Sequence, residues 1–154
     1  MTMHNAVKMS VVTISLSVSV VAGERPITRA QLPPAVERTV AEQSKGAVIR
    51  GFASEQAHGQ TTYEVALTVD GHARDISMDR LGHILEVEEE VALLSLPSAV
   101  RAGLAKAAGT RTIVKVESLT KKGTVVAYEA VVQRGSARSE IQMGPEGQKL
   151  THPE

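Results

Sequence analysis

The sequence contains no cysteine and very few aromatic residues. Its 154 residues include one Phe, two Tyr and no Trp. Without cysteine, the chain cannot provide disulfides, thiol nucleophiles or thiolate metal ligands. The scarcity of aromatic side chains argues against nucleic-acid binding, because single-strand binding platforms stack bases on aromatic rings. A hydrophobic core must therefore be built from Val, Ile, Leu, Met and Ala side chains.

Motifs of common catalytic and metal sites are also missing. The chain has no His-Glu-x-x-His motif, no Gly-x-Ser-x-Gly elbow and no glycine-rich phosphate loop. Asp79 and Gly82 lie in an expected turn, but the further acidic positions of an EF-hand loop are absent. We therefore expect no enzyme, no cofactor, and no catalytic, cofactor-binding or metal-binding residues.

The chain has no net charge, but its two halves differ. Residues 32–94 hold five Lys or Arg and eleven Asp or Glu, a net charge of −6, whereas residues 95–154 hold nine and five, a net charge of +4. Two independently solvated surfaces explain this difference most simply. The alternative is that the halves attract each other or present opposite fields to a partner.

What the sequence does contain is an approximate repeat. The stretch Leu32–Val36 returns as Leu96–Val100, 64 residues later. Two further patterns return at a spacing of 65 residues, namely Tyr-Glu at 63 and 128 and Ile-x-Met-x-x-x-Gly-x-x-Leu at 76 and 141. Self-similarity of this kind indicates a duplicated structural unit. Because a unit of about 60 residues has marginal burial, we expect the two copies to pack together.

Each copy begins with a predicted helix. In the first, Pro33 and Pro34 suit a first helical turn, Val36 and Val40 share one face, and Lys45-Gly46 marks the end. In the second, Val100, Leu104 and Ala107 or Ala108 form the apolar stripe and Gly109 ends the helix. Gly103 is a weak position in this helix, costing about 1 kcal/mol relative to Ala.

Strands follow each predicted helix. Residues 47–53 and 112–119 are rich in apolar side chains, and Tyr63, Val65, Leu67 and Val69 alternate with more polar residues, as do Tyr128, Ala130 and Val132. Asp70-Gly71 and Arg134-Gly135 are typical of hairpin turns. Turns at 79–82 and 144–147 lead to a last short strand in each copy.

These elements predict an α+β fold. We expect two tandem repeats, residues 23–94 and 95–154, each with one helix followed by three or four antiparallel strands. Both helices should pack on one face of the sheet and leave the opposite face open.

Residues 1–22 are expected to be a signal peptide. Lys8 supplies a positive start, 11–21 is apolar, and Val20-Val21-Ala22 ends in small residues. The strict alternation of apolar residues from Ile14 to Val20 is also typical of a strand, so that alternative stays open. If the signal is removed near Gly23, the mature protein is periplasmic or secreted. The apolar run is too short for a membrane span.

The chain resembles the PepSY-like family of secreted bacterial proteins, also described as β-lactamase-inhibitor-like. The resemblance rests on the Leu-Pro helix opening, the strand Tyr63, Val65 and Leu67, and the turn Asp79 to Gly82. The second copy departs from it, with Gly144 in place of the acidic turn residue. The resemblance implies a periplasmic or secreted, non-catalytic module that binds or inhibits other proteins, peptidases among them. It supplies no catalytic residue.

The remaining polar groups fit more than one interpretation. His58, His72 and His83 lie in or beside predicted turns, and His152 is near the end of the chain. The acidic run Glu86, Glu88, Glu89 and Glu90 is interpreted as a solvated linker and strand edge, where charge blocks edge pairing. Its alternative is a docking patch for a basic partner. The same alternatives apply to Lys121-Lys122.

The sequence thus predicts a secreted or periplasmic binding module, with inhibition of a protein or peptidase as one option. Its partner is expected to be another protein or peptide of the envelope, with neither nucleic acid nor a stable membrane span. The alternative is a ligand-binding or metal-binding envelope protein whose site forms between the repeats from His72, His83 and nearby carboxylates. A purely structural envelope role stands behind both.

Overall fold

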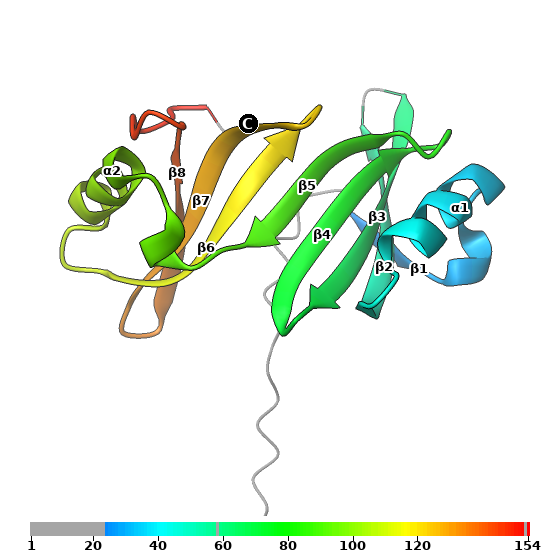
Figure 1. Cartoon of the computed structure of the whole chain (residues 1–154), viewed down its shortest axis with the longest axis horizontal. Coiled ribbons are helices and arrows are strands. Elements are labelled where there is room, and N and C mark those ends of the chain that lie inside the picture. Colours follow the sequence, from blue (N-terminus) through cyan, green and yellow to red (C-terminus); the bar gives the residue numbers. More distant parts are fainter. Residues whose placement is uncertain (1–23, 58, 153) are drawn as a thin grey trace, which may run out of the picture.

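A computed structural model describes residues 24–57, 59–152 and 154 (Figure 1). The helices are α1 (Pro34–Gln43) and α2 (Ser98–Ala108), with short 3₁₀ turns η1 (Arg29–Gln31) and η2 (Leu93–Ser95). The strands are β1 (Arg25–Ile27), β2 (Val48–Ala57), β3 (Gln60–Val69), β4 (His72–Asp79), β5 (Ile84–Glu90), β6 (Thr112–Lys121), β7 (Thr124–Arg134) and β8 (Ala137–Met143). The predicted signal peptide, residues 1–22, lies outside the described residues.

All eight strands form one antiparallel sheet in sequence order, β1 to β8. The predicted α+β fold of two repeats, each with one helix and three or four strands, is therefore wrong: the structure is one continuous sheet, mostly β, with two helices. The reason is the pairing of β5 with β6, which runs from Glu86 opposite Lys121 to Glu90 opposite Glu117. This pairing satisfies backbone groups that would otherwise end a first sheet. The predicted boundary between residues 94 and 95 stays a prediction.

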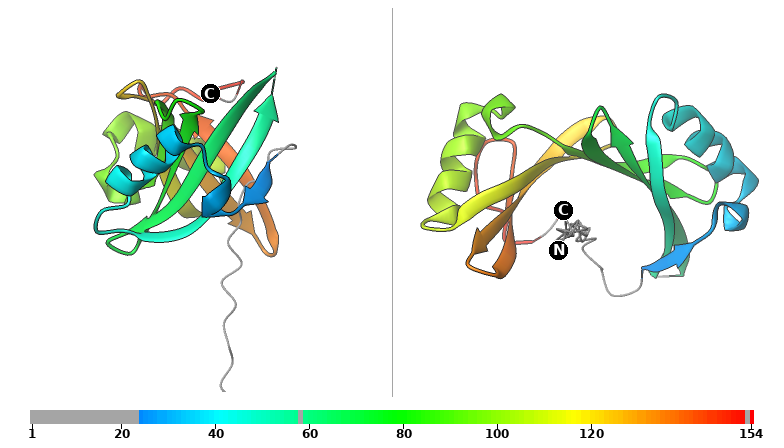
Figure 2. Two further views of the ribbon diagram at one scale, coloured as in Figure 1. Left: turned by 90° about the vertical axis from the view of Figure 1, so that its right-hand side faces the viewer. Right: turned by 90° about the horizontal axis from the view of Figure 1, so that it is seen from below.

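The sheet is strongly curved, and each helix covers one end of its convex face (Figure 2). Under α1, Val36 and Val40 pack into a buried cluster with Leu32, Val65, Leu67, Ile76 and Met78. Under α2, Val100 and Leu104 pack into a second cluster with Leu96, Ala108, Val116, Ala130, Val132, Ile141 and Met143. Among the described residues, the buried core positions are aliphatic, as the composition predicts, and Phe52, Tyr63 and Tyr128 pack against the clusters from partly buried positions. The buried positions follow the alternation predicted for β3 and β7.

The helix ends and the hairpin turns also agree with the sequence. α1 ends just before Gly46, which has a φ of 77°, and Gly109, with a φ of 60°, caps α2. Asp70 and Gly71 join β3 to β4 with φ angles of 50° and 86°, the left-handed pair that a two-residue hairpin requires. Strand β1 was not predicted, because its three residues lack any alternation. No helix among the described residues is long and apolar enough to cross a membrane.

Close packing against α2 explains why position 103 is a glycine, although glycine is a poor helix former. A Cβ atom at this position would lie 2.3 Å from the carbonyl oxygen of Gly147, in the turn that follows β8. Gly147 approaches α2 equally closely, since its own Cβ would lie 2.3 Å from the carbonyl oxygen of Ala99. The absence of two side chains thus lets this turn lie directly on the helix.

Candidate functional site

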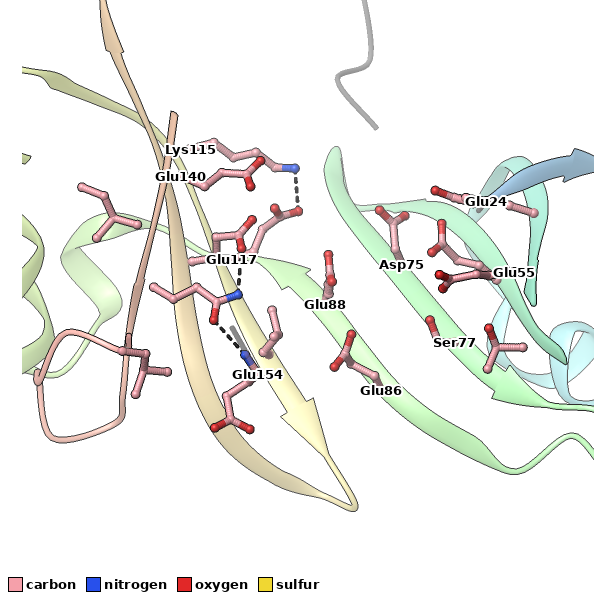
Figure 3. Close-up of a pocket in the computed structure, with 18 of the residues that line it drawn as sticks. Glu24, Glu55, Asp75, Ser77, Glu86, Glu88, Lys115, Glu117, Glu140 and Glu154 are labelled. Atoms are coloured by element: carbon pink, nitrogen blue, oxygen red, sulfur yellow. Dashed lines mark hydrogen bonds and ion pairs between the residues drawn. The ribbon is translucent and has the colours of Figure 1, made fainter. Parts of the chain in front are cut away.

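The concave face of the sheet forms a groove lined mostly by carboxylates (Figure 3). The cavity has a volume of about 570 Å³ and reaches from β2 to β8. We call this surface the acidic groove. Its charged lining, among the described residues, consists of Lys115, Lys149 and ten carboxylates, namely Glu24, Glu55, Glu64, Asp75, Glu86, Glu88, Glu117, Glu129, Glu140 and Glu154.

The two-residue period of the strands places these side chains on one face. Val65 and Leu67 of β3 are fully buried on the helix side. Glu64 directly precedes Val65, so its side chain points to the opposite face and lines the groove. The same alternation buries Ile76 of β4 and turns Asp75 toward the groove. Polar positions on the strands are therefore the groove positions.

Strand register then aligns the carboxylates into rows across the sheet. Asp75 of β4 lies opposite Glu88 of β5, and Glu117 of β6 lies opposite Glu129 of β7. Figure 3 shows side chains of β4, β5 and β6 pointing into the same space from neighbouring strands. Adjacent strands are about 4.8 Å apart, so like charges are held close together.

Cationic side chains of the same chain neutralise part of this surface. Arg50 Nη2 lies 2.6 Å from Asp75 Oδ1, and Lys115 Nζ lies 2.5 Å from Glu117 Oε1. Lys121 Nζ lies 3.3 Å from Glu86 Oε2, at the rim. Lys121 Nζ also lies 3.9 Å from Glu154 Oε2. Four of the groove carboxylates thus already hold a lysine or arginine side chain.

Burial and repulsion raise the pKa of several groove carboxyls. Burial, then the charges of Glu24 and Asp75, raise the pKa of Glu64 to about 7. Burial raises the pKa of Glu88 to about 8, and the charges of Glu86 and Glu117 act in the same direction. At neutral pH these two groups therefore carry only part of a negative charge each.

Two further groove carboxyls are affected in the same direction. Burial raises the pKa of Asp75 despite the opposing charges of Arg50 and Lys115. Burial also raises the pKa of Glu129, although Gln142 Nε2 donates a 2.9 Å hydrogen bond to its Oε2 atom. Ionisation is therefore unfavourable at these four positions of the groove.

The charge of the whole molecule is strongly polarised. Ten carboxylates and two lysines give the groove a formal net charge of −8. Because the chain is neutral, the remaining residues hold fifteen Lys or Arg and seven Asp or Glu, a net charge of +8. Two of these remaining cations, Arg50 and Lys121, pair with carboxylates of the groove.

Three of the carboxylates are close enough to share a metal ion. Ligand oxygens of Asp75, Glu88 and Glu117 all lie within 4.8 Å of one another. Oxygen donors of this kind suit Ca²⁺ or Mg²⁺. However, Asp75 already pairs with Arg50 and Glu117 with Lys115, so an ion would have to compete with both cations.

The structure does not bring the predicted histidines together. His72 begins β4, whereas His83 follows its far end and contacts Asp79, with its Nδ1 atom 2.9 Å from Asp79 Oδ2. Seven residues of strand separate His72 from Asp79, about 23 Å at 3.3 Å per residue. His152 contacts Thr151 at the end of the chain, and His58 lies outside the described residues.

The acidic run occupies a different place from the one expected. β5 is a central strand paired on both sides, so the interpretation of Glu86 to Glu90 as a strand edge is wrong. Glu86 and Glu88 face the groove, and Glu90 accepts a 3.1 Å hydrogen bond from the amide of Ala73. At the hairpin turn between β6 and β7, Lys121 pairs with Glu86, and Lys122 has a φ of 50°.

Sequence reasoning missed the other carboxylates of the groove. Glu64, Asp75, Glu117 and Glu129 each stand apart from other acidic residues in the sequence. One sequence feature could have identified them. Each alternates with the apolar core positions of its own strand and therefore lies on the opposite face. Charges sharing that face on successive strands indicate one surface only when the strands belong to one sheet.

Solved structures with a similar fold come from Bacteroides species. A BLIP-like protein from Bacteroides fragilis is 18% identical, with a TM-score of 0.55, covering 75% of this chain and 81% of that chain. A protein from Bacteroides eggerthii, provisionally named as periplasmic, is 15% identical, with a TM-score of 0.63 and coverages of 77% and 86%. A DUF2874 family protein from Bacteroides ovatus is 16% identical, with a TM-score of 0.60 and coverages of 78% and 85%.

These comparisons establish a likeness of fold. No protein-family model matches the sequence, and no curated protein matches it. The β-lactamase-inhibitor-like part of the predicted resemblance is supported by the BLIP-like structure. The PepSY-like assignment stays a prediction, and the comparisons do not confirm a tandem repeat.

Proposed function

On this fold, we propose that the protein is a non-catalytic binding module of the cell envelope and that the acidic groove is its binding surface for another protein. The observation that carries this proposal is the open concave face, polar and lined by ten carboxylates, opposite the convex face that both helices cover. The core positions are filled by apolar side chains. The groove carboxylates therefore lie outside both hydrophobic clusters.

The similar structures support this proposal in two ways. One is a BLIP-like protein, which favours a protein-binding role, with inhibition as its narrower form. Another is provisionally named as periplasmic, which agrees with the signal peptide predicted at residues 1–22. Both points come from proteins less than 20% identical and are therefore proposals for this chain.

Site-specific cross-linking tests the proposed surface. A photoreactive phenylalanine analogue at Ser77, which lines the groove, should give a discrete cross-linked product in cells that produce the protein. The same analogue at Ala105, on the exposed side of α2, should not give that product. Absence of a product from Ser77, or the same products from both positions, would contradict the proposal.

A divalent cation is the second candidate ligand of the groove. The proximity of Asp75, Glu88 and Glu117 favours it, whereas the separation of His72 from His83 removes the histidine site expected from the sequence. Calcium is therefore included as a separate probe in the titration described below.

A further inference from the structure

Resting on the proposed function, we propose that the occupant of the acidic groove is an extended segment of a partner protein that carries several Lys or Arg side chains. The segment crosses the strands from β3 to β7, and its cationic groups pair with carboxylates that have no cation of their own, chiefly Glu64 and Glu88.

This face already binds side chains of the required kind. Arg50, Lys115 and Lys121 each reach a groove carboxylate at 2.6, 2.5 and 3.3 Å. These contacts come from three different strand positions and leave most of the formal charge of −8 in place. The surface is therefore complementary to further cations, and the chain itself shows the geometry in which they are held.

The two central carboxylates have no cation paired with them. Among the described residues, no hydrogen bond or ion pair reaches the side-chain carboxylate of Glu64 or Glu88, although the charge of Arg50 acts on Glu64. Both are partly buried between like charges. A carboxylate in this situation gains more from an incoming cation than a fully solvated carboxylate does, because its charge is less screened by water.

The shape of the charged surface also fits an extended segment. One carboxylate or more comes from each of the five strands from β3 to β7, a width of about 19 Å at about 4.8 Å per strand spacing. An extended segment of six residues spans about 20 Å. A single divalent ion would meet only the three carboxylates around Glu88 and would compete with Arg50 and Lys115 there.

Calorimetric titration with a defined peptide tests this inference. The probe is a blocked seven-residue peptide of alternating Lys and Thr, and the protein is the chain without residues 1–22, at pH 8 and low salt. We expect 1:1 binding that weakens as salt is added, since the contacts are ionic. The Glu64→Gln/Glu88→Gln variant should bind at least tenfold more weakly, because two charge pairs are lost.

Matched controls make the outcome decisive. Glu42→Gln removes the same kind of charge from the exposed side of α1 and should leave the affinity unchanged. A peptide of alternating Glu and Thr should not bind. Equal loss in the Glu42→Gln variant, or calcium binding without peptide binding, would overturn the inference. A Ser77 cross-link without binding of the lysine peptide would contradict only the inference about the occupant. It would remain consistent with the proposed function.

Discussion

Replacing Glu64 and Glu88 together by glutamine should stabilise the protein at pH 8.5 by at least about 3 kcal/mol. In the folded protein these carboxyls have pKa values of about 7 and about 8, against an ordinary value of 4.5. Both are therefore ionised at pH 8.5 at a cost that the unfolded chain does not bear. Glutamine keeps the shape of the neutral acid and removes this cost.

The pH dependence has a defined sign. Between pH 4.5 and 8 the folded protein binds more protons at these two sites than the unfolded chain, so stability is greatest in the lower part of this range and is lost as pH rises toward 8. The groups that set this behaviour face Glu88 from its own and neighbouring strands: Glu86, Asp75, Glu117, Glu64, Glu129, Lys115 and Arg50. The variant should show a much flatter dependence.

Urea unfolding followed by circular dichroism at pH 5, 6.5 and 8.5 measures this effect. For a domain of this size the expected gain at pH 8.5 corresponds to about 10 °C in melting temperature. The Glu42→Gln variant serves as the control for loss of one exposed charge. A double variant no more stable than the natural protein at pH 8.5 would show that the groove carboxylates are not strained by burial and repulsion.

Gly103→Ala should destabilise the protein by about 2–3 kcal/mol, although alanine is the better helix former. Helix propensity alone predicts a gain of about 1 kcal/mol. In the structure, the added methyl group would lie 2.3 Å from the carbonyl oxygen of Gly147 and 3.2 Å from the sulfur of Met143. The turn after β8 must then move away from α2, and overpacking of this kind costs about 1–3 kcal/mol.

The reverse change elsewhere on the helix provides the control. Ala105 is exposed on α2, and Ala105→Gly should cost about 1 kcal/mol through helix propensity alone. Chemical denaturation of both variants gives the two free energies directly. If Gly103→Ala proves more stable than the natural protein, the close contact between Gly103 and Gly147 is not present in solution.

The sequence predicts local structure well where neighbouring residues alone determine it. The alternation of Val65 and Leu67, the left-handed turn at Asp70 and Gly71, and the end of α2 at Gly109 all depend on neighbouring residues. Each of these features is confirmed. The residues that form each feature are neighbours in the sequence, so a local pattern is enough to predict it.

Two larger features depend on contacts that the sequence does not encode locally. Glu86 to Glu90 has the composition of an exposed strand edge, yet β5 pairs with β6 across a connection that contains α2. Without that pairing, the carboxylates of β3, β4, β6 and β7 belong to separate units. The acidic groove exists only because one curved sheet brings them to one face.

The most direct test of the account is the number of protons released when the lysine peptide binds. Glu64 and Glu88 are partly protonated in the free protein near pH 7.5, and a cation beside them favours the ionised form, so binding should release about one proton. Titration in buffers of different ionisation enthalpy measures this number, which should fall toward zero at pH 9.5 and in the Glu64→Gln/Glu88→Gln variant. Peptide binding without proton release at pH 7.5 would contradict the account, because it would place the peptide away from the two central carboxylates of the groove.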